Sequence, residues 1–323
     1  MARTENPLIS IVLPVFNEEA GIKHTIEILE NYVASQPEEY ELIFVDDGCV
    51  DRSATIIQEA EQQYDNIRLI QFSRNFGHQL AITAGIRYAS GDAVVVMDAD
   101  LQDPPSVIPA MVSKWRDGYD VVYGKRLQRD GESWFKKFSA SAFYRILHKL
   151  ANIDIPLDTG DFRLMDRKVV KVLSKMDEPD PFVRGMVSWV GFKQTAVEYE
   201  RDERTAGTTK YPLSKMLHLS MNGITSFSDV PLKLVNVVGA LMIAIGVIYG
   251  FVSLFTGFAT LQFAIFSMFE LFGISLLMLG IVSAYLYRIF ETSRERPLYV
   301  VAKTSGFQQE RRPEIKQINE HVM

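Results

Sequence analysis

"VVVMDADLQDPP", from Val94 to Pro105, joins an apolar run to three aspartates and ends in two prolines. A run of β-branched residues between turn signals is typical of a buried strand. Proline donates no backbone hydrogen bond, so the two prolines end this strand. The stretch therefore predicts three carboxylates at the carboxyl end of a buried strand, which is where ligands bind in open α/β sheets.

Similar units surround this stretch between residues 8 and 124. Short apolar runs alternate there with segments of helical spacing, which predicts an α/β domain with a parallel-rich sheet covered on both faces. The strand ends would gather "PVFNEE", "VDDG" and "SRNFGH" beside the aspartates. The predicted strands are LISIVLPV, YELIFVDD, IRLIQFS, DAVVVMDAD and YDVVYG.

The composition of the 323 residues excludes some classes of protein. A formal net charge of -6 argues against a nucleic-acid partner, which would require an excess of Lys and Arg. Cys49 is the only cysteine, so the chain has no internal disulfide, as expected in a reducing compartment. The start, "MARTENPLIS", lacks the apolar core of a signal peptide, so we expect the bulk of the chain in the cytoplasm.

The C-terminal third has a different composition. Between Lys233 and Arg288 the only charged residue is Glu270, and this length predicts a hairpin of two transmembrane helices. Basic residues flank the hairpin, so the positive-inside rule places both chain ends in the cytoplasm. We therefore expect an integral membrane protein of the cytoplasmic (inner) membrane. Its parts would be a cytoplasmic catalytic domain (1–210), a juxtamembrane amphipathic helix (211–232), two spans within 233–290 (about 234–255 and 263–285) and a loosely ordered cytoplasmic tail (291–323).

Two further segments predict contacts with the sheet, the membrane or a second subunit. The segment Trp134 to Leu150 predicts a basic amphipathic helix, and its apolar face suits either packing on the sheet or the membrane interface. Small residues in the first predicted span would allow subunits to pack closely, which predicts a homo-oligomer. These residues are Gly239, Ala240, Ala244 and Gly246.

The aspartates themselves indicate a chemistry. Asp98 and Asp100 are two residues apart, and Gln102 adds an amide oxygen, a donor set that suits Mg²⁺ or Mn²⁺. The sequence contains neither the GxGxxG dinucleotide motif nor the GxxxxGK[ST] phosphate loop. We therefore predict a nucleoside diphosphate held through an aspartate-bound metal.

Five segments in order carry a family resemblance: "PVFNEE", "VDDGCVDRS", "RNFGHQLAITAG", "MDADLQDPP" and "TGDFRLMDR". With the predicted hairpin, they resemble the family 2 inverting glycosyltransferases of the polyisoprenyl-phosphate branch, which includes bactoprenol glucosyltransferases and dolichol-phosphate mannose synthases. The resemblance covers about residues 9–296. It implies a GT-A-like nucleotide-sugar-binding domain with interfacial helices and a C-terminal transmembrane hairpin.

The resemblance also implies roles for residues. The nucleotide-sugar would lie against Pro14, Phe16, Glu18, Asp46 and Asp98, and the metal would be bound by Asp100 and Gln102. Asp161 would serve as a base or, as we favour, orient Arg163 or the sugar. With Asp98, Asp100 and Arg126, these two residues form the predicted catalytic set. The acceptor phosphate would contact Arg126, Lys136, Lys137, Arg163, Arg204 and Lys210.

Simpler roles remain open for several of these residues. Glu18, Asp46 and Asp103 could cap helices, Arg163 could pair with Asp161, and Lys210 could be an ordinary interfacial lysine.

The predicted reaction transfers a hexose to a polyprenyl phosphate at the cytoplasmic membrane face, with inversion at the sugar. The favoured donor is UDP-glucose and the favoured acceptor is undecaprenyl phosphate. One alternative is a processive polysaccharide synthase, but the sequence lacks the QxxRW motif of such enzymes. The other is a membrane-anchored nucleotide-binding sensor without turnover.

Overall fold

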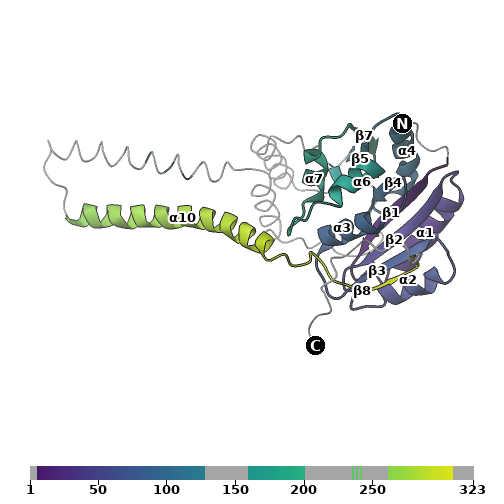
Figure 1. Ribbon diagram of the computed structural model, residues 1–323, viewed down its shortest axis with the longest axis horizontal. Helices are drawn as coiled ribbons and strands as arrows, with labels where there is room; N and C mark the ends of the chain where they lie inside the picture. Colours follow the sequence, from purple (N-terminus) through teal and green to yellow (C-terminus); the bar gives the residue numbers. More distant parts are fainter. Residues whose placement is uncertain are drawn as a thin grey trace. The chain divides into compact units, whose positions relative to one another are not determined.

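The computed structural model describes residues 6–127, 159–200 and 261–307, together with positions 235, 238 and 241. The chain divides into two compact units, and the α/β domain belongs to the first, which takes in residues 1–144, 154–212 and 297–323. Its centre is an eight-stranded sheet with the order β7-β5-β6-β4-β1-β2-β3-β8 (Figure 1). The strands are β1 (Leu8–Val15), β2 (Glu39–Asp46), β3 (Ile67–Phe72), β4 (Ala93–Val96), β5 (Val121–Arg126), β6 (Thr159–Asp166), β7 (Gln194–Tyr199) and β8 (Val301–Ser305).

The prediction of a parallel-rich sheet is confirmed for the part between residues 8 and 124. β1 pairs in parallel with β2 and β4, and β2 pairs in parallel with β3. β6 is antiparallel to both β4 and β5, so the sheet as a whole is mixed. Polar residues interrupt the apolar pattern of β6, "TGDFRLMD", which explains why the sequence pattern did not indicate this strand.

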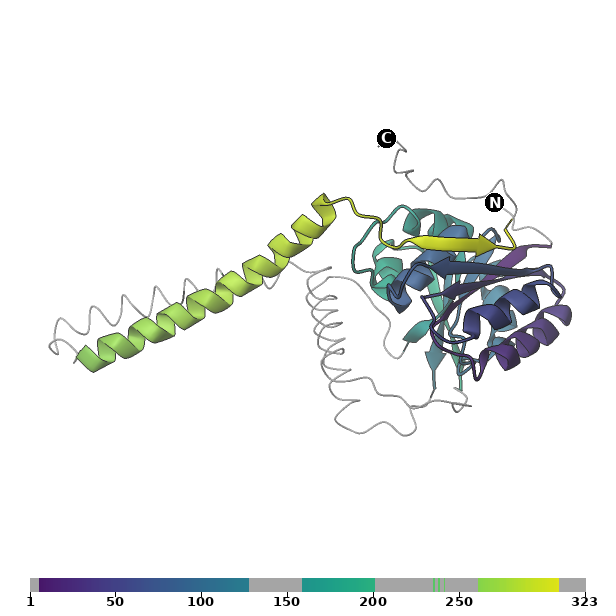
Figure 2. The ribbon, with the colours of Figure 1, turned by 90° about the horizontal axis from the view of Figure 1, so that it is seen from below.

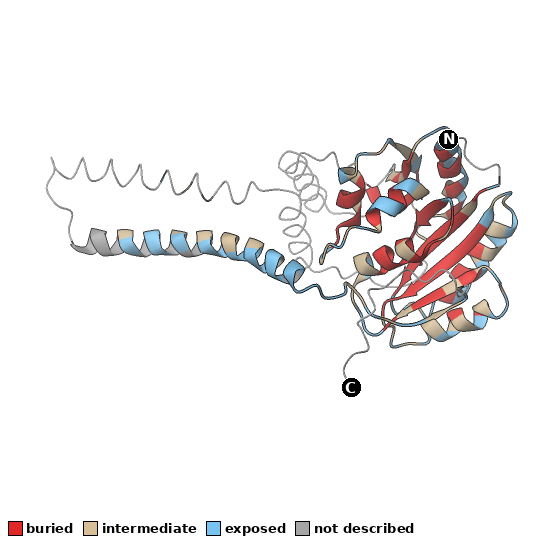
Figure 3. Ribbon diagram, viewed as in Figure 1, coloured by how far each residue is buried: buried red, intermediate tan, exposed pale blue. Residues whose placement is uncertain are grey.

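Helices cover both faces of the sheet (Figures 1 and 2). One face packs against α1, α2 and α4, and the other against α3, α6 and α7. Figure 3 shows that the central strands are buried almost throughout, as a two-sided cover requires. The helices of this unit are α1 (Ile22–Ala34), α2 (Ser53–Glu61), α3 (His78–Tyr88), the 3₁₀ turn η1 (Pro105–Val107), α4 (Ile108–Arg116), α6 (Arg167–Leu173) and α7 (Val183–Trp189).

The segment after Pro297 contains an ordered strand, which corrects the expectation of a loosely ordered tail. β8 pairs antiparallel with β3, from Leu69 opposite Ser305 onward. Just before β8, the ring of Tyr299 stacks on Phe72, with ring centroids 5.0 Å apart and an angle of 18° between the planes. Only five residues long, β8 is too short for its pattern to stand out in the sequence.

Most of the described part of the second unit is α10 (Leu261–Ser293), which contains the second predicted span, 263–285, and extends beyond it. A membrane span requires about 20 consecutive apolar residues in one helix. Within the described ranges, no helix satisfies the combined requirement of length and apolar character. This finding overturns the prediction of an integral membrane protein of the inner membrane.

Several other predictions fall outside the described residues. They are the helix at 134–150, the juxtamembrane helix at 211–232, most of the first span at 234–255 and the four small residues on which the predicted homo-oligomer rests. The domain boundary at residue 210 also lies there and stays a prediction.

Candidate functional site

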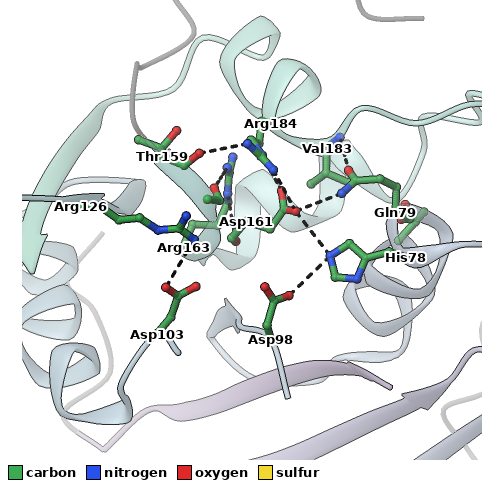
Figure 4. A network of polar contacts seen from close by, with 12 residues as sticks. His78, Gln79, Asp98, Asp103, Arg126, Thr159, Asp161, Arg163, Val183 and Arg184 are labelled. Carbon is green, nitrogen blue, oxygen red and sulfur yellow. Dashed lines mark hydrogen bonds and ion pairs between the residues drawn. The ribbon is translucent and has the colours of Figure 1, made fainter. Parts of the chain in front are cut away.

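The sheet register explains why distant carboxylates meet. β4 and β6 are antiparallel, with Val96 opposite Arg163. Two residues beyond Val96 and two before Arg163, the same register brings Asp98 and Asp161 opposite one another. Both therefore lie at the carboxyl end of β4, the edge that "VVVMDADLQDPP" predicted (Figure 4).

Asp98 is a carboxylate in a poorly solvated position. Its Oδ1 atom is buried and accepts no hydrogen bond from the described residues, and the Nε2 atom of His78 lies 3.5 Å away. Burial raises the pKa of Asp98 to about 6, and nearby Asp161 adds to the effect, although the charge of His78 opposes it. A carboxylate held in this way costs folding free energy, which is typical of a functional position.

Asp161 is more deeply buried and is well paired. Arg184 Nε lies 2.9 Å from its Oδ1 atom, Gln79 Nε2 donates to Oδ2 at 3.1 Å, and His78 Nε2 lies 3.5 Å from Oδ2. Burial alone would raise the pKa of Asp161, but the Arg184 charge and the hydrogen bonds outweigh it and hold the pKa well below its usual range. Asp161 is therefore an ionised carboxylate and a weak base.

Arg184 also donates from Nη1 to the carbonyl of Thr159 at 3.0 Å, so α7 is tied to the start of β6. Asp161 was expected to serve as a base or to orient Arg163 or the sugar, and this role stays a prediction. Among the described residues, the carboxylate of Asp161 forms an ion pair with Arg184. Arg163 is 4% exposed and donates from Nη2 to the carbonyl of Gly160 at 2.9 Å.

Arg126 and Asp103 form a neighbouring pair. Arg126 Nη2 lies 3.5 Å from Asp103 Oδ1, which also accepts a hydrogen bond from the Tyr199 hydroxyl at 2.5 Å. Burial lowers the pKa of Arg126, but the carboxylate of Asp103 outweighs this and the pKa is raised. Capping was one open role for Asp103 and stays a prediction; its Oδ1 atom contacts Tyr199 and Arg126.

The strand ends on the other side of β1 hold their acids differently. Asp46 accepts the backbone N–H of Cys49 at 2.7 Å and the side-chain amide of Gln71 at 3.3 Å. Neither α1 nor α2 has a side-chain cap, so Asp46 and Glu18 are not helix caps.

Asp47 fixes the loop that follows β3. Its carboxylate accepts the backbone N–H groups of Phe76 at 2.7 Å and Gly77 at 3.0 Å, and the side-chain amide of Asn75 at 2.9 Å. Gly48, at φ +72°, lies so close to this loop that a Cβ would be 2.4 Å from the backbone of Arg74. The segment 73–77 is thereby held against the end of β2, directly before His78.

Three predicted donor-side residues lie at the end of β1. Pro14 is buried and in register with Val45, and Phe16 is 47% exposed. Glu18 donates its backbone N–H to Ser53 Oγ at 2.9 Å, which joins the loop after β1 to α2. The exposed ring of Phe16 is free of the core and available to a planar ligand.

Asp100 and Gln102 form the turn after β4, where the Gln102 N–H donates to Asp100 Oδ1 at 3.2 Å. Within the described residues, no group of three or more His, Cys, Asp or Glu side chains could hold a metal ion. Mg²⁺ sites often use one or two carboxylates plus substrate phosphates instead of an all-protein cage. The oxygen donors of this turn therefore fit a metal that the substrate helps to bind.

A cavity of about 460 Å³ lies at the opposite end of the sheet, near the starts of β1 and β2, where it is lined by Leu8, Glu39 and Tyr88. None of the residues described above lines it. The converging charges, not this cavity, mark the candidate site.

The structure places the predicted catalytic set at one sheet edge and adds other residues to it. The set is Asp98, Asp100, Arg126, Asp161 and Arg163. Lys136, Lys137, Arg204 and Lys210 lie outside the described residues. His78 belongs to the predicted strand-end segment "SRNFGH", but nothing in the sequence pattern distinguishes it from its neighbours there. No sequence signal marked Arg184, Gln79 or Tyr199, whose contacts depend on tertiary structure.

Comparisons with known proteins identify the family of the chain. The model for "Glycosyl transferase family 2" matches residues 10–174. The uncharacterized glycosyltransferase YkcC of Bacillus subtilis (strain 168) is 52% identical over 311 residues, 94% of this chain and 95% of its own length. A bactoprenol glucosyl transferase of Shigella phage SfV is 36% identical over 302 residues, 91% of this chain and 97% of its own length.

Among solved structures, glucosyl-3-phosphoglycerate synthase from Mycobacterium tuberculosis has a TM-score of 0.48 at 20% identity, covering 68% of this chain and 77% of that chain. This likeness is too weak to carry an argument. The family model and the long alignments confirm the resemblance that the sequence motifs indicated, and the mixed α/β sheet agrees with a GT-A-like domain. The chain belongs to glycosyl transferase family 2.

Proposed function

We propose that this glycosyltransferase moves a hexose, glucose from UDP-glucose, to a polyprenyl phosphate, with inversion at the sugar. The observation that carries the proposal is the charged cluster at one sheet edge, where His78 lies between Asp98 and Asp161 and Arg184 pairs with Asp161, since a sugar donor and an anionic acceptor need both charges. The choice of sugar and lipid is supported by the relative whose name is bactoprenol glucosyl transferase.

On the donor side, the exposed ring of Phe16 would stack on the base and Asp46 would accept hydrogen bonds from it, beside Pro14 and Glu18. Asp98 would accept hydrogen bonds from the ribose and sugar hydroxyls through its unsatisfied Oδ1 atom. Asp100 and Gln102 would hold Mg²⁺ or Mn²⁺. When bound, the metal would supply positive charge against the diphosphate leaving group.

On the acceptor side, the nucleophile is a phosphate oxygen. The second pKa of a phosphate monoester is about 6, so the acceptor is already mostly a dianion at pH 7 and needs no base. Two unit charges about 6 Å apart repel by roughly 0.7 kcal/mol in water and roughly 3 kcal/mol at an effective dielectric constant of about 20. Arg126 and Arg163, with the four predicted basic residues outside the described ranges, would offset this repulsion.

Asp161 would orient the cations rather than accept a proton. Its low pKa makes it a weak base, and its carboxylate holds Arg184 at 2.9 Å. Attack by the phosphate oxygen on the sugar C1 atom, from the face opposite the nucleotide, forms the new C–O bond. The bond from C1 to the diphosphate breaks at the same time, so UDP leaves and an α-linked donor gives a β-linked product.

The test uses purified protein, radiolabelled UDP-glucose, Mn²⁺ and undecaprenyl phosphate in detergent. The expected product is labelled sugar that enters the organic phase and is released by mild acid. Asp100→Asn should lose at least about 100-fold in rate with an unchanged melting temperature, whereas Asp65→Asn, at an exposed position, should keep full activity.

Other outcomes identify the alternatives. Insoluble labelled polymer would indicate a processive synthase, and nucleotide binding without turnover would indicate a sensor. Unchanged activity in Asp100→Asn would remove the metal assignment. A screen of nucleotide sugars in the same assay tests the choice of glucose.

A further inference from the structure

We propose that His78 is a positioning residue that holds the donor-side carboxylate of Asp98 and the acceptor-side carboxylate of Asp161 in a fixed mutual geometry. This inference rests on the proposed function, because that function places Asp98 on the donor side and Asp161 on the acceptor side of the reaction.

The geometry of the imidazole carries the argument. One atom, His78 Nε2, lies 3.5 Å from Asp98 Oδ1 and 3.5 Å from Asp161 Oδ2 (Figure 4). A ring N–H directs one hydrogen, so it is shared between two acceptors or donates to one of them at a time. The Oδ1 atom of Asp98 accepts no hydrogen bond from the described residues, and the imidazole of His78 faces it at 3.5 Å. A shift of either carboxylate therefore acts on the other through this ring.

The chain holds the backbone of His78 in place independently of its side chain. His78 is the first residue of α3, and Gly77 before it adopts φ 109°, a conformation that favours glycine. Asp47 accepts the backbone N–H groups of Phe76 and Gly77, which fixes the two residues directly before it. A half-exposed side chain at the first position of a helix, after a loop fixed by Asp47, is well suited to positioning and contributes little to the core.

The charges around the ring agree with this role. Asp98 comes from the end of β4, Asp161 and its partner Arg184 from β6 and α7, and Asp47 from the loop after β2. Burial lowers the pKa of His78, but the hydrogen bond to Asp161 and the charge of Asp98 outweigh it, so the pKa is raised. A cationic ring offsets the repulsion between the two carboxylates, which the sheet register places opposite one another.

The first experiment compares His78→Ala with His24→Ala, a control at an exposed position of α1. In the transfer assay, His78→Ala should lower kcat about 100-fold, the scale of a misplacement of about 1 Å. The KM for UDP-glucose should change less than about threefold, because Asp98 and the nucleotide contacts remain. The melting temperature should match that of the control, and added imidazole should restore part of the kcat lost by His78→Ala.

Several results would overturn the proposal. They are a kcat equal to that of His24→Ala, a loss in KM with kcat unchanged, or a loss that follows the melting temperature and is not restored by imidazole. If the wild-type chain transfers no sugar at all, the proposed function fails instead.

A second measurement needs no turnover. The imidazole resonances of His78 in the full chain should shift on Asp161→Asn, while those of His24 stay in place. Unmoved His78 resonances would show that the ring does not contact Asp161 in solution, and the proposal would be wrong.

Discussion

Two groups of acids at the same sheet edge are held in opposite ways. Asp46, the last residue of β2, and Asp47 directly after it accept hydrogen bonds from nearby backbone N–H groups and side-chain amides. Asp98 and Asp161, after β4 and in β6, face the charged groups His78 and Arg184. The difference separates acids that shape loops from acids that form a charged centre, although the sequence presents all four as carboxylates near strand ends.

The distinction has an energetic basis. Backbone N–H groups are fixed donors, so an acid that accepts them stabilises one loop conformation. Side-chain cations move with their own elements, and a carboxylate between them joins several parts of the chain. Loss of the first kind should change stability alone. Loss of the second should change activity, with an added loss of stability where, as for Asp161, an arginine is left without its anion. Four substitutions test this separation.

The largest expected effect is on activity in Asp98→Asn. Removal of the charge that faces the donor should lower kcat about 100- to 1000-fold. The free energy of unfolding should rise, because a buried carboxylate oxygen without a hydrogen bond is replaced by a neutral group. Transfer assays and urea titrations measure both effects. A loss of stability would place Asp98 with the loop-shaping acids and break the comparison.

Asp161→Asn should have the next largest effect. It leaves Arg184 without its anion and should cost about 3 kcal/mol of unfolding free energy at pH 7. Because the folded-state pKa of Asp161 is lowered, its contribution is complete above the unfolded pKa of about 3.9. The difference from wild type should therefore stay constant from about pH 8 to pH 5 and shrink below about pH 4. Urea unfolding at several pH values would contradict this if the difference grew on acidification.

Asp47→Ala tests the loop-shaping acids. It leaves the N–H groups of Phe76 and Gly77 without their acceptor and should cost about 2 kcal/mol. Amide hydrogen exchange should speed up at those two residues and stay unchanged in β4. Asp65→Ala, at an exposed position, is the matched control. Equal exchange in the two variants would show that Asp47 does not hold the loop.

The smallest effect is expected for Tyr199→Phe. The hydroxyl donates to Asp103 at 2.5 Å and lies 3.3 Å from Arg126 Nε, so its loss should cost about 1 kcal/mol. Phenylalanine preserves the edge-to-face contact with Phe162, so packing is retained. Chemical denaturation measures the change in unfolding free energy. A loss of several kcal/mol would mean that the pair of Arg126 and Asp103 serves the fold rather than ligand binding.

Local pattern predicted the part of the fold between residues 8 and 124, because each parallel strand there is a continuous apolar run. The family resemblance, not local pattern, implied that Asp98, Asp161 and Arg126 share a site. Local pattern did not predict β6, whose polar residues interrupt the run, or Arg184, which meets Asp161 across 23 residues. The membrane prediction failed because it rested on composition alone, and the structure offers no qualifying helix in its described ranges.

The β8 strand affects how the protein can be made. The residues between Tyr199 and Val301 separate it from β7 in the chain, so β3 lacks its outer partner until that segment has left the ribosome. During this interval, the apolar strand β3 exposes unpaired N–H and C=O groups to any other nascent chain. Chains that end before Val301 would therefore be lost mainly by edge-to-edge aggregation during synthesis, even with every charged residue of the site intact.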